Sequence, residues 1–323
     1  MSVVVPKLEK GNPRSLARII RQVDDDPRTA RQILKEIYHQ TGHAWVIGVT
    51  GPAGVGKSTL VNQLVHAWRK ADLKVGVIAI DPTSPFTGGA ILGDRIRMQD
   101  HEGDPGVFMR SMATRGHMGG LSRATSDVID ILDAYGMDIV LVETVGVGQD
   151  EVDIARVAHT TILVLVPGLG DDVQALKAGI MEIADIYVIN KRDREGAARM
   201  KQEIQAILAL SEMIIHDSDW KPPILLTRAT HGEGIDDLVT TLNEHRRYLA
   251  SSGRWFERRR SYATMRFFEA VRSLLTEQLE EDLRAPDLQS PIEAIARGKL
   301  DPYTAARAYL RDRAGKWQDE PVD

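Results

Sequence analysis

Short apolar runs alternate with amphipathic segments from about residue 44 to residue 250. Each run is continuous and rich in Val, Ile and Leu, which predicts a buried strand. The predicted strands are 45–50, 75–80, 107–109, 139–143, 161–166, 186–190 and 224–227. The helical segments between them include 58–70, 121–134, 172–183, 197–210 and 235–249. This order predicts an α/β fold with a mostly parallel sheet covered by helices on both faces.

Helical patterns also lie on both sides of this alternating region. Before it, Pro13 and Pro27 each follow a capping residue and precede apolar residues at helical spacing, which predicts peripheral helices. After it, Ser251, Ser252 and Gly253 interrupt the pattern, and further helices are expected over 254–284, 291–297 and 302–313. The predicted parts are an N-terminal helical extension, a main domain and a C-terminal helical extension, with bounds 1–43, 44–250 and 251–323.

The long helix expected over 254–284 carries an apolar stripe and an unusual order of charges. It starts basic and ends acidic, which opposes the helix dipole and indicates that the charges face another surface. Its apolar residues recur at helical spacing at Met265, Phe268, Val271, Leu275 and Leu279. The stripe fits packing against the main domain and equally fits a dimer interface. A homodimer through this arm is the prediction that we carry forward.

Composition narrows the class of protein. The chain of 323 residues has a net charge of −5 and contains no cysteine. This charge gives no general attraction to nucleic acid or membrane. The lack of cysteine excludes disulfides, thiolate metal sites and a cysteine nucleophile. Because no apolar run is long enough to span a bilayer and the N-terminus does not resemble a signal peptide, we expect a soluble cytoplasmic protein.

A glycine-rich loop follows the first predicted strand and leads into a helix. In this context the pattern G-x-x-x-x-G-K-S predicts a phosphate-binding loop. Backbone N–H groups and the positive end of the helix surround a polyphosphate, Lys57 reaches the β- and γ-phosphates, and the Ser58 hydroxyl binds Mg²⁺. The expected phosphate-binding residues are Gly51, Pro52, Ala53, Gly54, Val55, Gly56, Lys57, Ser58 and Thr59.

A second motif, Asn190-Lys191-Arg192-Asp193, follows a later strand and selects the base. The Asp193 carboxylate can accept hydrogen bonds from the guanine N1–H and N2 amino groups, which adenine does not offer in that arrangement. Asn190 and the stem of Lys191 are expected to hold the loop and cover the base. The combination with the phosphate loop favours GTP over ATP.

A third loop, Arg228-Ala229-Thr230, follows the last predicted strand. It is expected to lie over the guanine, with the Ala229 N–H directed at O6 of the base.

Glu143 ends another predicted strand, and Gly146 follows three residues later. In a P-loop GTPase this position holds the acid linked to Mg²⁺ and the glycine that senses the γ-phosphate. We therefore predict that the Glu143 carboxylate is linked to the metal ion and that Glu143 is a catalytic residue. Gln149 lies beyond the usual offset for a residue that orients the attacking water, and whether it takes part in hydrolysis stays open.

The segment 81–98 is rich in Gly and Pro and suits a loop that orders around the γ-phosphate and Mg²⁺. Asp81 is assigned to the metal shell. Asp94 is assigned to the metal or to positioning the attacking water. The segment 168–179 is a candidate further switch, with a plain strand-to-helix turn as the alternative.

In this order and spacing, the motifs resemble those of the MeaB/ArgK-like family of G proteins. They are GPAGVGKST, DPTSPFTGGAILGDRIRM, VETVGVGQ, GLGDDVQALKAGIMEIAD and NKRD. The resemblance covers about residues 12–250 through motifs, and the long second motif is the most diagnostic. One departure is Arg228, where the family often has Ser or Thr.

The resemblance implies a P-loop NTPase G domain and a chaperone of adenosylcobalamin-dependent methylmalonyl-CoA mutase. It implies slow, Mg²⁺-dependent hydrolysis of GTP to GDP and phosphate that the mutase stimulates, gating cofactor delivery, protection or exchange. Carried over to this chain, Ser58, Asp81, Asp94 and Glu143 surround Mg²⁺. No cobalamin site is identified in the sequence. Neither the particular mutase nor the surface that contacts it can be read from the sequence.

Two other functions were weighed. A nickel-type metal-insertion GTPase shares the fold class, but such proteins need Cys and His ligands near the switches, and this chain has no Cys and scattered His. A GTP-gated binding module with negligible turnover is the non-enzymatic alternative.

Overall fold

The computed structural model describes residues 8–81, 101, 103–113, 123–144, 150–168, 178–212, 219–283 and 289–316. The chain forms two compact units, Met1–Ala263 and Thr264–Asp323. The division falls within the long helix α11 (Arg254–Leu283) and not at the break in the sequence pattern at residues 251–253. The first turns of α11 belong to the larger unit because their side chains bond to residues beside the sheet.

The described part of the larger unit contains one seven-stranded sheet, in the order β3-β2-β4-β1-β5-β6-β7. Every described pairing is parallel. The strands are β1 (Trp45–Thr50), β2 (Val75–Asp81), β3 (Val107–Ala113), β4 (Ile139–Glu143), β5 (Thr160–Leu165), β6 (Ile186–Ile189) and β7 (Ile224–Leu226). All residues of β1, β4, β5 and β6 are buried, as expected for a parallel sheet covered on both faces. The predicted α/β fold is confirmed.

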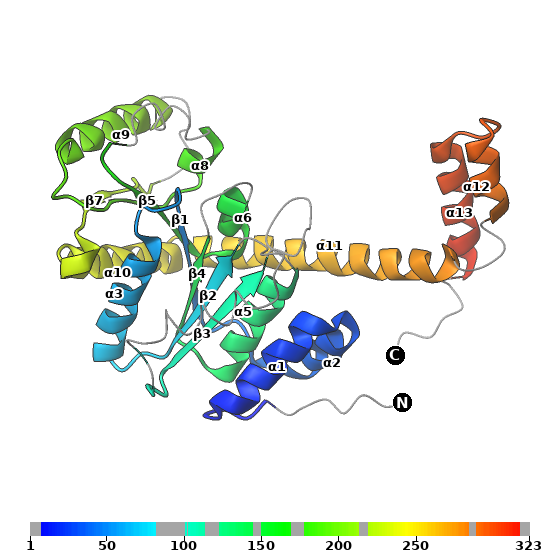
Figure 1. The fold of residues 1–323 in the computed structure, drawn as a ribbon, viewed down its shortest axis with the longest axis horizontal. Helices are drawn as coiled ribbons and strands as arrows, with labels where there is room; N and C mark the ends of the chain where they lie inside the picture. The colour runs from blue at the N-terminus through cyan, green and yellow to red at the C-terminus, as the bar shows by residue number, and fades with distance from the viewer. Residues whose placement is uncertain are drawn as a thin grey trace. The chain divides into compact units, whose positions relative to one another are not determined.

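Helices cover both faces of the sheet (Figure 1). One face packs against α3 (Lys57–Lys70) and α10 (Ile235–Ser251). The other face packs against α5 (Arg123–Tyr135), α6 (Asp150–Val157), α8 (Ala178–Glu182) and α9 (Ala197–Glu212). Alternate residues of β1 divide between these layers: Ile47 and Val49 join the core under α3, whereas Gly48 faces Ile154 of α6.

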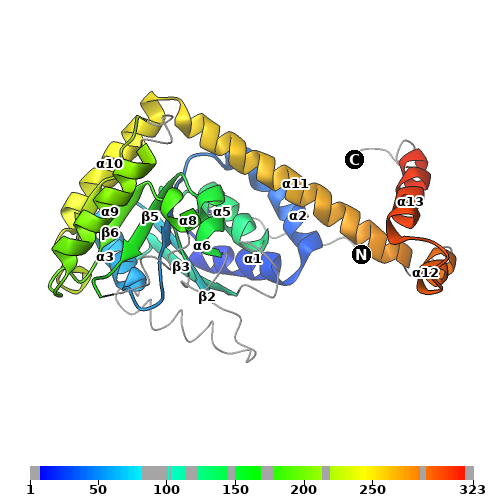
Figure 2. The same ribbon diagram turned by 90° about the horizontal axis from the view of Figure 1, so that it is seen from above.

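Two N-terminal helices, α1 (Pro13–Asp25) and α2 (Pro27–Ile37), form a further layer beside α5 (Figures 1 and 2). Asn12 and Asp26 cap them, each accepting hydrogen bonds from two backbone N–H groups. A short 3-10 helix, η1 (Tyr38–Gln40), leads toward β1. The carboxylate of Asp133 in α5 accepts the N–H groups of His43 and Ala44, at 3.1 and 2.9 Å. The N-terminal helices therefore join the sheet's own unit.

Some predicted elements differ from the observed ones. The helix α6 was not predicted because it is short, and the β3 strand extends four residues beyond its predicted end at Met109. In the 172–183 segment, helix is described only at Ala178–Glu182. The second unit contains the rest of α11, with α12 (Gln289–Ala296) and α13 (Pro302–Lys316). No helix of the described ranges is both long and apolar enough to cross a membrane.

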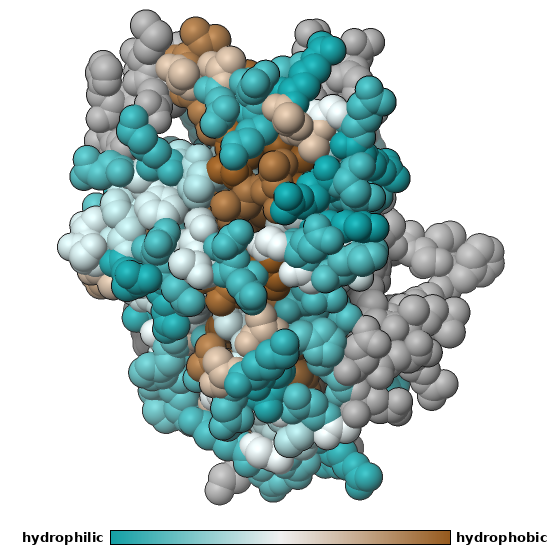
Figure 3. Space-filling model, turned by 90° about the vertical axis from the view of Figure 1, so that its left-hand side faces the viewer, coloured by the Kyte–Doolittle hydropathy of each residue, from teal (hydrophilic) through white to brown (hydrophobic). Residues whose placement is uncertain are grey.

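The sheet ends at β7, a three-residue edge strand. Figure 3 shows the side of the molecule on which α9, α10 and β7 lie in Figure 1, with apolar side chains in a broken band between hydrophilic ones. The residues Ile224, Leu225 and Leu226 of β7 are half-buried, and Leu210 of α9 is exposed. Two prolines precede β7, and a short strand flanked by proline presents few free backbone groups for further pairing.

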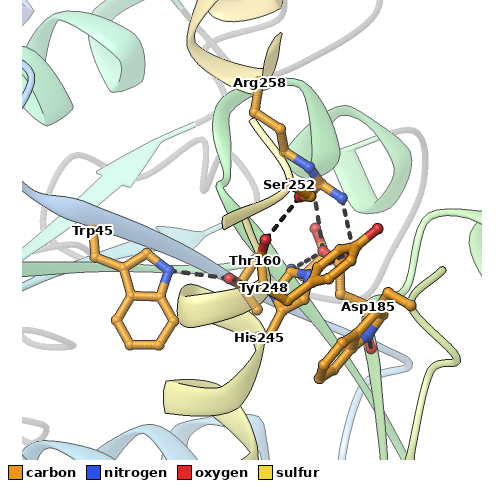
Figure 4. A network of polar contacts seen from close by, with 9 residues as sticks. Trp45, Thr160, Asp185, His245, Tyr248, Ser252 and Arg258 are labelled. Atoms are coloured by element: carbon orange, nitrogen blue, oxygen red, sulfur yellow. Dashed lines mark hydrogen bonds and ion pairs between the residues drawn. The ribbon is translucent and has the colours of Figure 1, made fainter. Parts of the chain in front are cut away.

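A buried polar network joins the amino ends of the central strands to α10 and α11 (Figure 4). We call it the edge network, and its members are Trp45, Thr160, Asp185, His245 and Arg258. The indole N–H of Trp45 donates to Thr160 Oγ1 at 3.0 Å, and this hydroxyl lies 2.9 Å from His245 Nδ1. Two nitrogens of Arg258 donate to the two oxygens of Asp185, at 2.6 and 3.1 Å. The first turns of α11 are thus fixed to the sheet.

Aromatic rings surround the edge network. Trp255 of α11 stacks on His159, with ring centroids 4.3 Å apart, and Trp68 of α3 meets Trp45 edge-on at 6.4 Å. Trp220 donates its indole N–H to the backbone oxygen of Asp185 at 2.9 Å. This amino edge is consequently a closely packed, largely aromatic part of the larger unit.

Burial sets the charge of His245, and the neighbouring polar groups determine which of its nitrogens carries the proton. Burial lowers the pKa of His245 to about 4, against a smaller raising effect of Asp185 and a lowering effect of Arg258. The imidazole is therefore neutral at neutral pH. Because the Asp185 carboxylate can only accept and lies 3.5 Å from His245 Nε2, we assign the imidazole proton to Nε2. His245 Nδ1 then accepts the Thr160 hydroxyl, which in turn accepts from Trp45.

We expect the free energy of unfolding to fall as the pH falls from about 6.5 toward 4. In the unfolded chain His245 titrates near 6.5, whereas in the folded protein it titrates near 4. The unfolded state binds more protons in this window, so acid favours unfolding by up to about 3 kcal/mol for this group. Urea titrations of the protein and of His245→Asn at several pH values measure the slope.

The variant should show a smaller slope, whatever its stability at pH 7. The exposed His39→Asn provides the matched control and should keep the slope of the unsubstituted protein. Burial also lowers the pKa of His159, to about 3, so part of the slope should remain in the variant. Equal slopes for His245→Asn and the unsubstituted protein would show that the His245 imidazole does not contribute to the slope.

Candidate nucleotide-binding site

The predicted phosphate loop, residues 51–56, connects β1 to α3 at the carboxyl edge of the sheet. Two of its glycines are required by close contacts. A Cβ on Gly51 would lie 2.1 Å from the backbone oxygen of Val164 in β5, and a Cβ on Gly56 would lie 2.5 Å from Nδ2 of Asn190. Both residues also have positive φ, 138° and 96°. The loop is therefore packed against β5 on one side and against the Asn190 loop on the other.

The start of α3 is built to receive an anion. Its N-cap is Gly56, which has no side chain to accept hydrogen bonds from the first N–H groups of the helix. Gly56 therefore leaves these N–H groups available to an anion. Lys57 is only 5% exposed, and its ammonium donates to the backbone oxygens of Gly51 and Pro52 at 2.6 and 2.8 Å. The cation thus lies over the loop that would hold the phosphates.

Ser58 and Glu143 bring oxygen ligands together beside the phosphate loop. Glu143 is the last residue of β4, which pairs with β1 so that Glu143 is opposite Val49. The Ser58 hydroxyl donates to Glu143 Oε1 at 2.5 Å. Because a hydroxyl and a carboxylate oxygen are hard ligands of the kind that Mg²⁺ takes, these residues fit the expected metal.

The remaining predicted metal and switch residues are described less completely. Asp81 ends β2 and pairs with Ala113 of β3, and its side chain lies outside the described part. Asp94, Gly146 and Gln149 lie outside the described residues, as does most of the candidate switch at 168–179. Their assignments stay predictions.

Asn190 connects the phosphate loop to the base side of the site. It follows β6 and is 3% exposed. Its Nδ2 donates to the backbone oxygen of Val55 at 2.9 Å. Its Oδ1 accepts the Thr227 hydroxyl at 3.2 Å and the Ala229 N–H at 3.1 Å. The Asn190 amide therefore connects three loops, namely its own loop after β6, the phosphate loop after β1 and the loop after β7.

Lys191 adds a second contact between these loops. Its backbone has a positive φ of 56°, and its ammonium donates to the backbone oxygen of Gly54 at 2.8 Å. The Lys191 stem thus spans from the N-K-R-D loop to the phosphate loop. Asp193 lies beyond it with its side chain 48% exposed, where a base could reach it.

The third loop differs in one detail from its expected geometry. The Ala229 N–H, which was expected to face guanine O6, donates in this structure to Asn190 Oδ1. A base would have to share this donor or replace that acceptor. Arg228 places its side chain beside Asp193, with Nε 3.6 Å from Oδ1, and Thr230 is exposed.

The sequence interpretation did not include two threonine contacts at strand ends. Thr227 donates to Asn190, and Thr144 donates to the Thr50 hydroxyl at 3.0 Å, which ties the ends of β4 and β1 together. A threonine directly after a strand and before a predicted ligand loop is the signal that could have identified them.

Comparison with known proteins gives one family and a consistent set of relatives. The family model described as "Methylmalonyl Co-A mutase-associated GTPase MeaB" matches residues 16–284. A protein of Pyrococcus abyssi whose name describes a GTPase is 49% identical over 97% of this chain and 96% of its own length. The mouse protein named "Methylmalonic aciduria type A homolog, mitochondrial" is 31% identical over 82% of this chain and 64% of its own length.

Among solved structures, the crystal structure described as a LAO/AO transport system kinase matches with a TM-score of 0.63 and 25% identity, over 96% of each chain.

We expect Asn190→Ala to destabilise the protein by about 1–3 kcal/mol, because it leaves the Val55 oxygen and the Ala229 N–H without their buried partner. It should also weaken the affinity for nucleotide, since the phosphate and base loops lose their common contact. Urea unfolding and nucleotide titration measure the two effects. Asn243→Ala, on the exposed side of α10, is the control, and equal unfolding midpoints for the two variants would contradict the role given to Asn190.

Proposed function

The chain belongs to the MeaB family of methylmalonyl-CoA mutase-associated GTPases, and we propose that it is the GTP-hydrolysing chaperone of an adenosylcobalamin-dependent acyl-CoA mutase. Methylmalonyl-CoA mutase is the partner that we propose first. The observation that carries the proposal is the family match over residues 16–284, which includes the phosphate loop, the N-K-R-D loop and all of α11.

The family model and the Pyrococcus abyssi relative are both described as GTPases, and this chain is a GTPase. We assign the base to Asp193 and to the loop containing Arg228, Ala229 and Thr230. Support for this assignment comes from Asn190, which connects that loop to the phosphate loop. These hydrogen bonds would hold a base bound at Asp193 at a fixed distance from phosphates bound at the start of α3.

In the proposed mechanism, the chain contributes positioning and electrostatic stabilisation. The Lys57 ammonium moves from its loop carbonyls to the β- and γ-phosphate oxygens and neutralises charge that develops during hydrolysis. The first N–H groups of α3 hold the same phosphates. Mg²⁺ would be held by Ser58 and Glu143, with Asp81 and Asp94 as further ligands or shell residues, and would supply additional positive charge.

The mutase link is supported by the family description and by the mouse relative named for methylmalonic aciduria. In this proposal GTP turnover gates cofactor delivery, protection or exchange at the mutase. The chain is proposed to act as a homodimer through α11. The exposed apolar side chains of that helix support a surface that another protein covers, and they include Phe267, Phe268, Leu274 and Leu275.

We expect Asp193→Asn to lower the preference for GTP over ATP and to weaken GDP binding. Asparagine replaces one carboxylate oxygen with an NH2 group, so a donor instead of an acceptor faces either the N1–H or the N2 amino group of guanine. Competition titrations with GDP, ADP and a fluorescent guanine nucleotide measure the preference. An unchanged ratio of affinities would remove Asp193 from the base site.

We expect the partner mutase to raise the rate of GTP hydrolysis in single-turnover assays. The apo-mutase, the holo-mutase and an unrelated acyl-CoA enzyme are compared at equal concentration. Lys57→Ala is the control without turnover, because it lacks the cation that stabilises the transferred phosphoryl group. A hydrolysis rate that no mutase changes would argue against the chaperone function and favour a GTP-gated binding module.

A further inference from the structure

We propose that Arg228 is a positioning residue that orients the Asp193 carboxylate for guanine and thereby strengthens guanine-nucleotide binding. The inference rests on the proposed function, because it takes Asp193 as the residue that reads the base. It assigns a role to the Arg228 side chain, whereas the proposed function uses only the loop to which Arg228 belongs.

The Arg228 guanidinium lies between two carboxylates from different loops. Its Nε is 3.6 Å from Asp193 Oδ1, and its NH1 nitrogen is 3.7 Å from Glu233 Oε1. The Arg228 side chain is 33% exposed, compared with 48% for Asp193 and 46% for Glu233. The cation is therefore the most buried of the three groups and the one best placed to restrict the others.

The backbone fixes the point from which the Arg228 side chain extends. The backbone N–H of Arg228 donates to the backbone oxygen of Glu233 at 3.0 Å, and the two residues form an antiparallel bridge that encloses η3 (Ala229–His231). The loop also closes tightly at Gly234, where a Cβ would lie 2.4 Å from the Leu226 oxygen. This bridge keeps Glu233 within reach of the guanidinium.

The Asp193 loop is held in register with the same segment. The Arg192 N–H donates to the backbone oxygen of Thr227 at 3.0 Å, directly before Arg228. The approach of Arg228 to Asp193 therefore follows from the backbone of both loops and does not depend on two long flexible side chains meeting by chance.

A carboxylate has about four lone-pair positions on its two oxygens. Guanine N1–H and N2–H need one position on each oxygen, which leaves a further position on Oδ1 for the guanidinium. A half-exposed carboxylate without a partner samples several rotamers, and binding must then restrict it. An ion pair that restricts it beforehand lowers this cost and so raises affinity.

The expected size of the effect is modest, because a partly exposed ion pair contributes little. We expect Arg228→Ser to raise the Kd for a fluorescent GDP analogue by about threefold to tenfold. In GTP hydrolysis the loss should appear in KM and not in kcat, since Lys57 and Ser58 act at the other end of the nucleotide. Arg228→Lys keeps a cation and should recover part of the affinity.

Arg194→Ser is the matched control. It removes the same charge from an exposed position one residue beyond Asp193, so a general electrostatic attraction of the nucleotide would weaken equally in both variants. Equal losses in Arg228→Ser and Arg194→Ser would overturn the positioning role. An affinity for GDP that stays within twofold in Arg228→Ser would overturn it as well.

A double-mutant cycle separates positioning from direct contact. In Asp193→Asn, the probe is a fluorescent xanthosine diphosphate, whose C2 oxygen can accept from the asparagine amide. If Arg228 acts through the carboxylate, adding Arg228→Ser in this background should change the Kd less than twofold. An equal loss in both backgrounds would show that Arg228 contacts the nucleotide itself and would overturn the inference.

The same cycle distinguishes failure of the inference from failure of the proposed base site. If Asp193→Asn alone leaves the GDP affinity and the preference for guanine unchanged, Asp193 does not read the base, and the proposed site fails together with the inference. If Asp193→Asn changes the preference and Arg228→Ser does not change the affinity, only the inference fails.

Discussion

The side-chain amide of Asn190 is the contact on which the rest of the site depends. It is buried, and its nitrogen donates a hydrogen bond to the phosphate loop. Its oxygen accepts hydrogen bonds from two groups of the loop that follows β7. A parallel sheet brings strand ends to one edge, but it does not by itself fix the loops that follow them. The Asn190 amide supplies that fixed relation between the phosphate loop and the loop proposed to bind the base.

The two edges of the sheet do different work. The carboxyl edge holds the groups to which the proposed mechanism assigns a change of partner, such as Lys57, whose ammonium donates here to loop carbonyls. The amino edge holds the edge network, in which Asp185 is bound by Arg258 and by the Thr161 N–H. The edge network and the candidate nucleotide site therefore lie at opposite edges of the sheet, and the site is at the edge where ligands bind in open α/β sheets.

The sheet could be predicted from the sequence because its strands follow from local patterns, and local motifs likewise supplied the candidate site residues, whose roles stay predictions. Continuous apolar runs identify buried parallel strands, and the glycine, lysine and serine of the phosphate loop are required by backbone contacts and charge. The edge network could not be predicted, because Trp45, Asp185 and Arg258 come from distant segments of the chain. Asp185 ends one of the family motifs, but no motif indicates that it pairs with Arg258. The partner of Ala229 was also beyond sequence reasoning, since its N–H could face either a base or Asn190.

The aromatic character of the amino edge has a spectroscopic consequence. The four described tryptophans, Trp45, Trp68, Trp220 and Trp255, all lie around the edge network. Their emission reports on the region where α11 leaves the sheet, and not on the phosphate loop. A change in the emission of these four tryptophans on addition of nucleotide would therefore record a signal that has passed from the carboxyl edge of the sheet to its amino edge. Because Trp317 lies outside the described residues, this measurement is made in a Trp317→Phe background.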